Sequence, residues 1–508
     1  MTFLAAVIIV VAFVLWGLVA PSQLADSANH ALAFSTEKFG WFYLLVTFGF
    51  LIFCFYLAFS RYGQIRLGAD DEEPEYSTMT WFAMLFSAGM GIGLVFWGVA
   101  EPVSHYLNPP MDIEAKTAEA ARTAVRYSFF HWGLHPWAIY AVIALSLAYF
   151  QFRKGEKGLI SSTFRPLLGK RIDGPWGKTI DTLSIIATAF GVATSLGLGT
   201  LQINGGLTHL FNLPGSLLVQ ISIIGIITVL YLLSATTGLD KGIKILSNTN
   251  LVLALLLLLF TLLLGPTSFI FDIFTTTLGS YLQNIVQMSM RLTPFTKGTW
   301  VGSWTLFYWA WWIAWAPFVG MFIARVSRGR TIKEFIIGVL LVPSLLSFLW
   351  FSVFGGTALQ QEMFGKLPIG EAVSADITSA LFITLESLPM GMILAFLATL
   401  LIITFFITSA DSATFVLGML SSNGNLNPSN KIKLTWGILQ SLIAAVLLYS
   451  GGLQGLQTAS IVAALPFAVI MVLMCVSLLK SLNGEDQARR RREKEIRRQL
   501  DILLNEKK

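Results

Sequence analysis

The sequence has few charged residues and few cysteines, and it lacks a phosphate-binding glycine loop. Only 12% of its 508 residues are charged, whereas ordinary globular domains carry about 25%. Cys54 and Cys475 both lie in apolar runs, so the chain has neither a disulfide framework nor metal-ligand spacing. The missing Walker-type loop argues against ATP-driven transport by this chain alone. A water-soluble domain, a disulfide scaffold and an ATPase are therefore all disfavoured.

Long apolar runs dominate instead. Hydrophobic residues make up 55% of the chain, and the mean hydropathy is +0.70. Runs of membrane-spanning length recur from Phe3 to Leu482, which predicts an all-α polytopic membrane protein. The first run lacks a clear cleavage site, so we expect a retained helix. We predict about twelve transmembrane helices, near residues 3–20, 40–60, 79–100, 124–150, 180–202, 215–235, 248–271, 300–324, 335–356, 388–420, 434–451 and 455–480.

Lysine and arginine divide unevenly between alternate connections of these spans. One set of connections is rich in them, with Arg153, Lys154 and Arg325 among its members, and the other set holds few. The positive-inside rule then places the rich set and both termini in the cytoplasm, in a multi-pass protein of the cell membrane. The net charge of +6 reflects these loops and a basic tail. It does not indicate a surface for nucleic acid.

The spans also suggest an internal repeat. Spans three to seven and eight to twelve have similar lengths, and an odd number of helices per half makes the two halves inverted. The expected parts are two N-terminal helices with a loop (1–78), a first repeat (79–271), an external amphipathic helix (272–299), a second repeat (300–482) and a basic cytoplasmic tail (483–508). The first helix of each repeat is interrupted, which is the best sequence pointer to a transporter's substrate site.

Span three is interrupted by the run Gly89-Met90-Gly91-Ile92-Gly93. Each glycine costs about 1 kcal/mol in a helix interior, so the run favours unwinding. Unwound backbone at membrane depth is tolerated around a cavity, where its N–H groups can bind a carboxylate. Close helix packing through small residues is the alternative. We predict that Gly89, Met90 and Gly91 bind substrate.

Span eight is rich in aromatic residues between Trp304 and Phe322. Helical spacing puts Trp311, Trp315 and Phe322 on one face, with Trp312 beside it. The rings continue through the middle of the span, where an interfacial aromatic belt has no place. Indole faces attract desolvated cations, and quaternary ammonium groups are their usual guests. Packing bulk is the alternative reading.

Span four carries a second aromatic group. Trp132, Trp137 and Tyr140 occupy one broad arc of the helix and could complete a box with the rings of span eight. Taken alone, they would be packing residues. His131 and His135 have the i, i+4 spacing of metal ligands, but no cysteine or carboxylate accompanies them in this stretch, so we expect interhelical hydrogen bonds.

Two further stretches are suggestive. The hydroxyls of Thr408 and Ser409 on span ten, with nearby carbonyls, suit a small hard cation such as sodium, although such residues also join helices. The tail contains the run Arg489 to Arg492, whose charges can bind anionic lipid headgroups at roughly 1 kcal/mol each. A plain topology anchor is the alternative, and a sensor of ionic strength is the sharper hypothesis.

Together these motifs resemble one family. Over nearly its full length the chain is similar to the betaine/carnitine/choline transporter family. The stretches that carry this resemblance are Ala88-Gly89-Met90-Gly91-Ile92-Gly93, Trp97-Gly98-Val99-Ala100-Glu101-Pro102, His131-Trp132-Gly133-Leu134-His135-Pro136-Trp137, Tyr308-Trp309-Ala310-Trp311-Trp312, Trp315-Ala316-Pro317-Phe318 and Arg325-Val326-Ser327-Arg328-Gly329-Arg330-Thr331.

The resemblance implies a fold and a substrate site. The fold is the five-plus-five inverted repeat of the leucine-transporter type, with two extra N-terminal helices and often a homotrimeric assembly. The implied box for a trimethylammonium group consists of Trp132, Trp137, Tyr140 and Trp312. The residues implied to line or gate the permeation path are Trp311, Trp315 and Phe322.

The resemblance also implies how ions are used. The Gly-x-Gly-x-Gly form resembles sodium-coupled glycine betaine importers, whereas proton-coupled choline members tend to have Asp where this chain has Gly93. The implied first sodium site uses the carbonyls of Ser87, Met90 and Phe405 and the hydroxyls of Thr408 and Ser409. A second would use Thr188 and Phe318. The chain departs from the family pattern at Val192, where a hydroxyl is expected one turn after Thr188, and this weakens the second site.

The predicted function is sodium-driven import of glycine betaine, or a close zwitterionic quaternary amine, for osmoprotection. We expect no cofactor besides the coupling ion, and no enzymatic activity, because no nucleophile–base pair or cofactor motif stands out. Three alternatives remain: a sodium-independent carnitine-type exchanger, which Thr408 and Ser409 disfavour; a proton-coupled choline importer, which Gly93 disfavours; and a betaine-binding sensor that does not transport.

Overall fold

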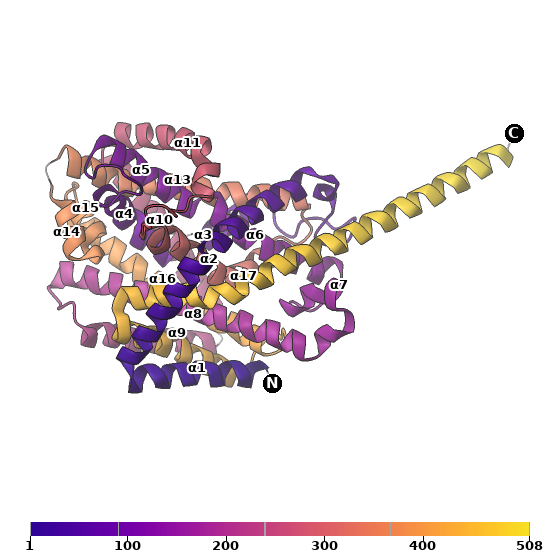
Figure 1. The fold of residues 1–508 in the computed structure, drawn as a ribbon, viewed down its shortest axis with the longest axis horizontal. Coiled ribbons are helices and arrows are strands. Elements are labelled where there is room, and N and C mark those ends of the chain that lie inside the picture. Colours follow the sequence, from indigo (N-terminus) through magenta and orange to yellow (C-terminus); the bar gives the residue numbers. More distant parts are fainter. Residues whose placement is uncertain (1, 90, 238–239, 366, 507–508) are drawn as a thin grey trace.

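The computed structural model describes residues 2–89, 91–237, 240–365 and 367–506, and these parts of the chain are helical with short connections (Figure 1). They contain no β-strand, only an isolated bridge between Arg66 and Thr331. The α-helices are α1 Thr2–Val19, α2 Pro21–Phe59, α3 Thr78–Gly89, α4 Ile92–Leu107, α5 Ala118–Trp132, α6 Leu134–Ala148, α7 Arg165–Leu168, α8 Pro175–Phe211, α9 Leu217–Thr237, α10 Asp240–Leu264, α11 Thr267–Ser289, α12 Phe307–Val326, α13 Ile332–Met363, α14 Ile369–Ala375, α15 Ala380–Glu386, α16 Gly391–Ser421 and α17 Asn430–Glu506.

The long helices account for the predicted spans. Among the described residues, ten helices are long and apolar enough to cross a membrane, which confirms a polytopic α-helical membrane protein. The predicted third span is absent from these ten because it is divided into α3 and α4. The predicted last two spans are counted once, because α17 continues across a kink at Gly452, where φ is +53° and glycine is favoured. With these two differences, the prediction of about twelve spans agrees with the structure.

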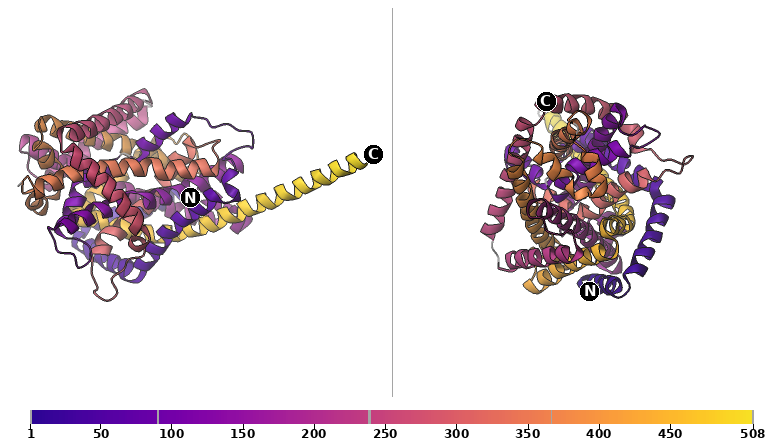
Figure 2. Two further views of the ribbon diagram at one scale, coloured as in Figure 1. Left: turned by 90° about the horizontal axis from the view of Figure 1, so that it is seen from above. Right: turned by 90° about the vertical axis from the view of Figure 1, so that its left-hand side faces the viewer.

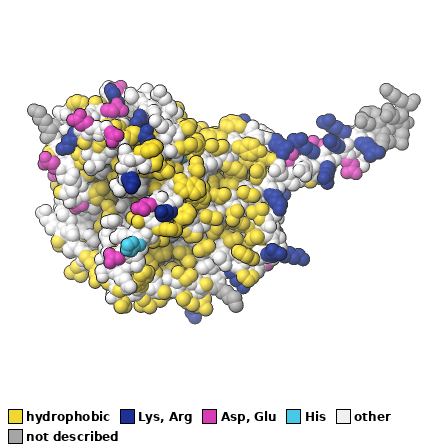
Figure 3. All heavy atoms as spheres, in the orientation of Figure 1, with side chains coloured by type: hydrophobic (Ala, Val, Ile, Leu, Met, Phe, Trp, Pro, Cys, Tyr) yellow, Lys and Arg dark blue, Asp and Glu magenta, His cyan; other side chains and the backbone are white. Residues whose placement is uncertain are grey.

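The helices form one bundle with a buried centre (Figure 2). The most apolar window of α5 and α6 is 100% buried inside the protein, whereas that of α1 is 22% buried, so the span-four helices are central and α1 is peripheral. Hydrophobic side chains cover a broad band of the outer surface (Figure 3). Lysine and arginine gather at the end from which α17 projects beyond the body. This distribution suits a protein surrounded by lipid.

Two glycine breaks position the site. As predicted, span three is interrupted: α3 ends at Gly89, and the extended backbone of Gly91 precedes α4. Span four, predicted as one helix, is also broken, at Gly133 between α5 and α6. A Cβ at Gly133 would lie 2.7 Å from the ring of Phe348, which stacks on Phe129. The glycine at this break therefore lets α13 approach closely.

The predicted amphipathic segment at 272–299 corresponds to α11, which begins earlier and ends at Ser289. It packs on α5 and α13, with Tyr281 and Met288 buried and Leu282 56% exposed. The second amphipathic element expected near residues 376–388 corresponds to the short helix α15 and the turn before it.

Candidate functional site

An aromatic cavity lies where the broken helices meet. Trp132 and Trp137 of span four line it together with Trp312 of α12, and Tyr140 completes the predicted box. Its other lining residues are Gly91, Ile92, Gly93, Leu94, Pro136, Ser195, Trp311, Trp315, Ser347 and Ser409. The free volume is 40 Å³, which leaves room for only a few water molecules. The structure thus brings together all four residues of the predicted box.

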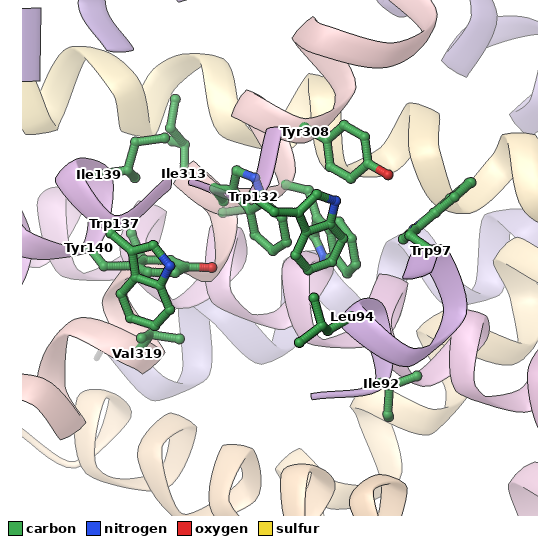
Figure 4. Close-up of a cluster of buried hydrophobic side chains, with 14 of the residues drawn as sticks. Ile92, Leu94, Trp97, Trp132, Trp137, Ile139, Tyr140, Tyr308, Ile313 and Val319 are labelled. Atoms are coloured by element: carbon green, nitrogen blue, oxygen red, sulfur yellow. The ribbon is translucent and has the colours of Figure 1, made fainter. Parts of the chain in front are cut away.

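Three contacts among the four rings of the predicted box are edge to face, whereas the Trp311 and Trp312 rings are stacked at 4.6 Å and 16°. The Trp132 and Trp312 centroids are 4.8 Å apart at 75°, and the Tyr140 and Trp312 centroids are 6.2 Å apart at 76°. Trp137 and Tyr140 meet at 5.5 Å and 79° (Figure 4). Aromatic pairs prefer the edge-to-face geometry, because a ring edge is positive and a ring face negative.

Three indole N–H groups of the cavity donate to acceptors in the protein. Trp312 Nε1 donates to the backbone oxygen of His131 at 3.0 Å, and Trp311 Nε1 donates to Ser195 Oγ at 3.3 Å. Trp132 Nε1 donates to Glu101 Oε2 at 2.8 Å. Because each N–H is bonded, the orientation of these three rings is set by the surrounding helices.

Glu101 of α4 is fully buried and lies at the centre of a polar cluster. Besides Trp132, its Oε2 accepts from Tyr308 Oη at 2.5 Å. Its Oε1 lies 2.7 Å from His131 Nδ1 and 3.2 Å from His105 Nε2. Figure 4 shows Trp132 and Tyr308 side by side, with Trp97 of α4 nearby. Neither Glu101 nor Tyr308 was predicted to have a role of its own, because no local sequence pattern indicates which side chains they contact.

The two histidines of span four make interhelical hydrogen bonds, as predicted. His131 also reaches Thr305 Oγ1 through Nε2 at 2.9 Å, and His135 Nε2 lies 2.8 Å from Ser289 Oγ of α11. Among the described residues, the group with metal-ligand types is Glu101, His105 and His131, whose ligand atoms lie within 4.8 Å of one another. However, His131 uses both ring nitrogens in hydrogen bonds and the carboxylate has four donors around it, so hydrogen bonding accounts for the cluster.

A second, wide cavity of 790 Å³ adjoins the aromatic cavity. Gly91, Trp315 and Ser409 line both, so Trp315 stands between them. The wide cavity reaches the surface near Arg325 and Leu426, which are exposed. Of the predicted path residues, Trp315 and Phe322 line it, whereas Trp311 faces the aromatic cavity alone.

The wide cavity also gathers the predicted ligands of the first sodium site. Ser87, Phe405, Thr408 and Ser409 all line it. The predicted fifth ligand, Met90, lies outside the described residues, and so does its predicted contact with substrate. Gly89 is the last residue of α3.

Thr408 is engaged with a neighbouring helix. Its Oγ1 lies 3.0 Å from the Thr404 oxygen and 3.2 Å from the Phe405 oxygen, and it accepts from Asn250 Nδ2 of α10 at 2.9 Å. Asn250 is buried, lines the wide cavity and has no partner for its Oδ1. Asn250 was not predicted; the available signal was the polar run Ser247-Asn248-Thr249-Asn250 at the start of an apolar span.

The residues of the weaker second ion site lie on adjoining helices. α8, which carries Thr188, packs against α12, which carries Phe318. The Thr188 hydroxyl donates to the Ser184 oxygen of its own helix at 2.7 Å, and Phe318 lines the wide cavity, which Thr188 does not. One turn later, Val192 is a buried apolar side chain and offers no oxygen ligand.

Ion pairs join two loops at the mouth of the wide cavity. Arg325, at the end of α12, donates to Glu75 Oε2 at 2.8 Å, and Arg328 pairs with Glu72 at 2.5 Å. The hydrogen bond from Arg325 lowers the pKa of the Glu75 carboxyl below its ordinary value. These contacts tie the loop before α3 to the loop after α12, the first helices of the two predicted repeats.

Comparisons with known proteins agree on one group. A family model described as "BCCT, betaine/carnitine/choline family transporter" matches residues 1–487. The glycine betaine transporter OpuD of Bacillus subtilis is 56% identical over 494 residues, covering 97% of this chain and 96% of that protein. An ectoine/hydroxyectoine transporter of Virgibacillus pantothenticus is 49% identical, covering 97% and 98%. A probable glycine betaine transporter of Desulfitobacterium hafniense is 49% identical, covering 93% and 95%.

Proposed function

Because the chain belongs to the betaine/carnitine/choline family of transporters, we propose that it imports glycine betaine across the cell membrane, driven by sodium. It is a multi-pass membrane transporter and not an enzyme. The substrate assignment is supported by relatives named as glycine betaine transporters. The assignment of the coupling ion is supported by the oxygen-rich lining around Thr408.

The aromatic cavity is the observation that carries the substrate assignment. Four rings from α5, α6 and α12 surround one small space at the centre of the bundle. A desolvated cation over such rings is stabilised by about 2 kcal/mol or more. The carboxylate end of the substrate would face the extended backbone at Gly91, where α4 begins, because backbone N–H groups at a helix N-terminus suit an anion. The cavity must widen to admit a trimethylammonium group, so binding is coupled to movement of the helices that carry the rings.

The position of the proposed sodium ligands supports the proposed coupling. Ser87 belongs to α3, and Phe405, Thr408 and Ser409 belong to α16. An ion held between these helices would stabilise one arrangement of them over the other, and this differential affinity is what couples ion and substrate. In this structure Asn250 bonds to Thr408, so ion binding requires that bond to rearrange. We assign the second site, at Thr188 and Phe318, a minor part at most.

The proposed orientation places the mouth of the wide cavity in the cytoplasm. The mouth is lined by Glu156, Lys157 and Arg325, which belong to the connections that the positive-inside rule assigns to that side. The proposal places both termini there as well. On this reading the structure has its inward side open, with Trp315 between the exit path and the aromatic cavity.

The proposal includes the larger organisation. Residues 79–271 and 300–482 would form the two inverted repeats, preceded by two extra helices, and three copies would form the transporter. The side chains of residues 487–499 are exposed on α17. We propose that the arginines of this segment contact anionic lipid headgroups.

Ectoine import is a second candidate, favoured by the ectoine/hydroxyectoine transporter that is 49% identical to this chain. Ectoine is zwitterionic but lacks a trimethylammonium group, so a box of four rings fits glycine betaine better.

Uptake into proteoliposomes tests both coupling and substrate. Purified protein is given labelled glycine betaine with an inward sodium gradient or with an equal potassium gradient. Accumulation that requires sodium, and that unlabelled betaine suppresses more strongly than ectoine, is expected. Uptake that ignores sodium would favour an exchanger, and stronger suppression by ectoine would replace the substrate. Binding without uptake under either gradient would favour a sensor.

A further inference from the structure

Glu101 is an ionisable side chain buried at membrane depth just behind the aromatic cavity. It lies on α4, is 0% exposed, and is absent from the lining of both cavities. Taking a carboxylate out of water is costly unless hydrogen bonds replace those lost. A residue of this kind within a membrane bundle indicates a role in function rather than in folding alone.

The bonds of Glu101 join three helices. An indole N–H can only donate, so Glu101 Oε2 must accept from Trp132 Nε1 of α5, at 2.8 Å. The same oxygen accepts from Tyr308 Oη of α12 at 2.5 Å, a length typical of a charge-assisted bond. The other oxygen faces His131 and His105. Carboxylate, indole and phenol therefore hold one another in a single arrangement.

The arrangement fixes how Trp132 faces the cavity. Its ring lines the aromatic cavity and meets Trp312 edge to face, while its N–H is held on the opposite side by the carboxylate. Tyr308, also held by Glu101, stacks behind Trp312 at 5.9 Å and 21°. Glu101, which does not line the cavity, thus holds the Trp132 ring directly and the Trp312 ring through Tyr308.

The charge of Glu101 has no permanent counterion nearby. Among the described residues, the ion-pair contacts of Glu101 are with His105 and His131 and include no Lys or Arg. A negative charge one ring away from the cavity attracts a cation inside it, and the low polarity of the surroundings preserves that attraction. A hydrogen bond from the indole to an anion also enriches the ring face in electron density.

We propose that Glu101 is the positioning residue of the aromatic box, holding Trp132 and Tyr308 in place and supplying negative charge behind the cation end of the substrate. This inference rests on the proposed function, because it takes the cavity to bind a quaternary ammonium group. It explains why a fully buried carboxylate lies at this point of α4 among aromatic residues.

The test compares glycine betaine with tert-butylacetate, its isostere in which a neutral carbon replaces the ammonium nitrogen. Affinities of both are measured on the purified full chain in nanodiscs. Glu101→Gln keeps an acceptor oxygen and the shape but removes the charge. We expect the preference for betaine over the isostere to fall roughly tenfold. An unchanged preference, or an equal loss of both affinities, would overturn the proposal.

A matched control and a second variant complete the design. Asp181→Asn removes another buried carboxylate, held by Ser161 away from the aromatic cavity, and should leave the preference unchanged. If the Gln variant does not fold, Trp132 is replaced by its benzothiophene isostere, which lacks the N–H. Loss of affinity for both ligands is then expected, and wild-type affinity would refute the positioning role.

The measurements distinguish an error in the proposed function from an error in the role of Glu101. If the unmodified protein does not prefer betaine to tert-butylacetate, the cation-binding role of the box is wrong. If it has that preference and Glu101→Gln retains it, only the role of Glu101 is wrong.

Discussion

The two cavities of this protein differ in size and in how their polar groups are satisfied. The aromatic cavity has 40 Å³ of free space, and the N–H groups of Trp132, Trp311 and Trp312 all have fixed acceptors. The wide cavity has 790 Å³, and Asn250 Oδ1 at its wall has no protein partner; the same is true of Nε1 of Trp315, which lines both cavities. Three of the rings of the aromatic cavity are held in fixed orientations in advance. The wide cavity has an amide oxygen that can take a new hydrogen-bond or ion partner. Substrate recognition would thus depend on a small aromatic cavity, and release on a larger cavity with polar groups at its wall.

The largest expected effect is on the aromatic cavity. Trp312→Leu keeps apolar bulk but removes the ring face, at a cost of about 2 kcal/mol or more, which corresponds to roughly a 30-fold loss of betaine affinity. Isothermal titration on the purified variant measures it. Trp436→Leu is the control, since it removes a buried indole bonded to Ser421 on other helices and should not alter affinity. Unchanged affinity in the Trp312 variant would remove the cation–π assignment.

The next largest effect is expected from substituting one of the two glycines that line the aromatic cavity, Gly93 and Gly91. A Cβ at Gly93 would lie 2.5 Å from the Trp311 ring and 3.1 Å from the Trp132 ring, whereas a Cβ at Gly91 would meet nothing within 4 Å. Gly93→Ala should therefore destabilise the protein by about 1–3 kcal/mol, as overpacking does. Gly91→Ala should leave thermal stability nearly unchanged. Equal melting temperatures for both variants would show that the rings yield easily and that the cavity is not rigid.

A third prediction concerns the wide cavity. Thr408→Val removes the hydroxyl but keeps the shape, and the sodium concentration that half-saturates uptake should rise about tenfold, as loss of an ion ligand worth about 1.4 kcal/mol would give. Thr399→Val, on the same helix, removes a hydroxyl that bonds to Ala395 and lies outside both cavities. It should leave the sodium dependence as it is. A shift of the same size in both variants would point to helix packing instead.

The smallest effect is expected at the mouth of the wide cavity. Glu75→Gln breaks the pair with Arg325, a partly exposed contact worth less than about 1 kcal/mol. Because the folded protein lowers the pKa of Glu75, the pair stabilises the protein above the ordinary carboxyl pKa, and this is lost as the pH falls through the lowered value. Melting temperatures of variant and parent should differ slightly at neutral pH and converge in acid. Glu73→Gln in the same loop serves as the control.

The spans were predictable because each leaves a local signal in the sequence, whereas the four residues of the box were implied by resemblance to the family. An apolar run of membrane length gives a helix, and the three glycines of span three gave its break. The break at Gly133 was missed, because a single glycine inside an apolar run usually continues a helix; here the approach of Phe348 decides. The partners of Glu101 were missed for a related reason. They lie on three helices, and no local pattern records which side chains meet across a bundle.

Beyond the kink at Gly452, α17 continues as a helix to Glu506; it contains Pro466 inside the span and no proline in residues 467–506. Its last part, residues 483–506, extends about 36 Å beyond the end of the last predicted span. A helix without a hinge behaves as a rigid lever, so a tilt of roughly 10° within the bundle would sweep the tip through about 6 Å. The reverse also holds: anything that grips the tip applies a torque to the packed spans. The tail and the bundle are therefore one mechanical part, although they lie in different surroundings.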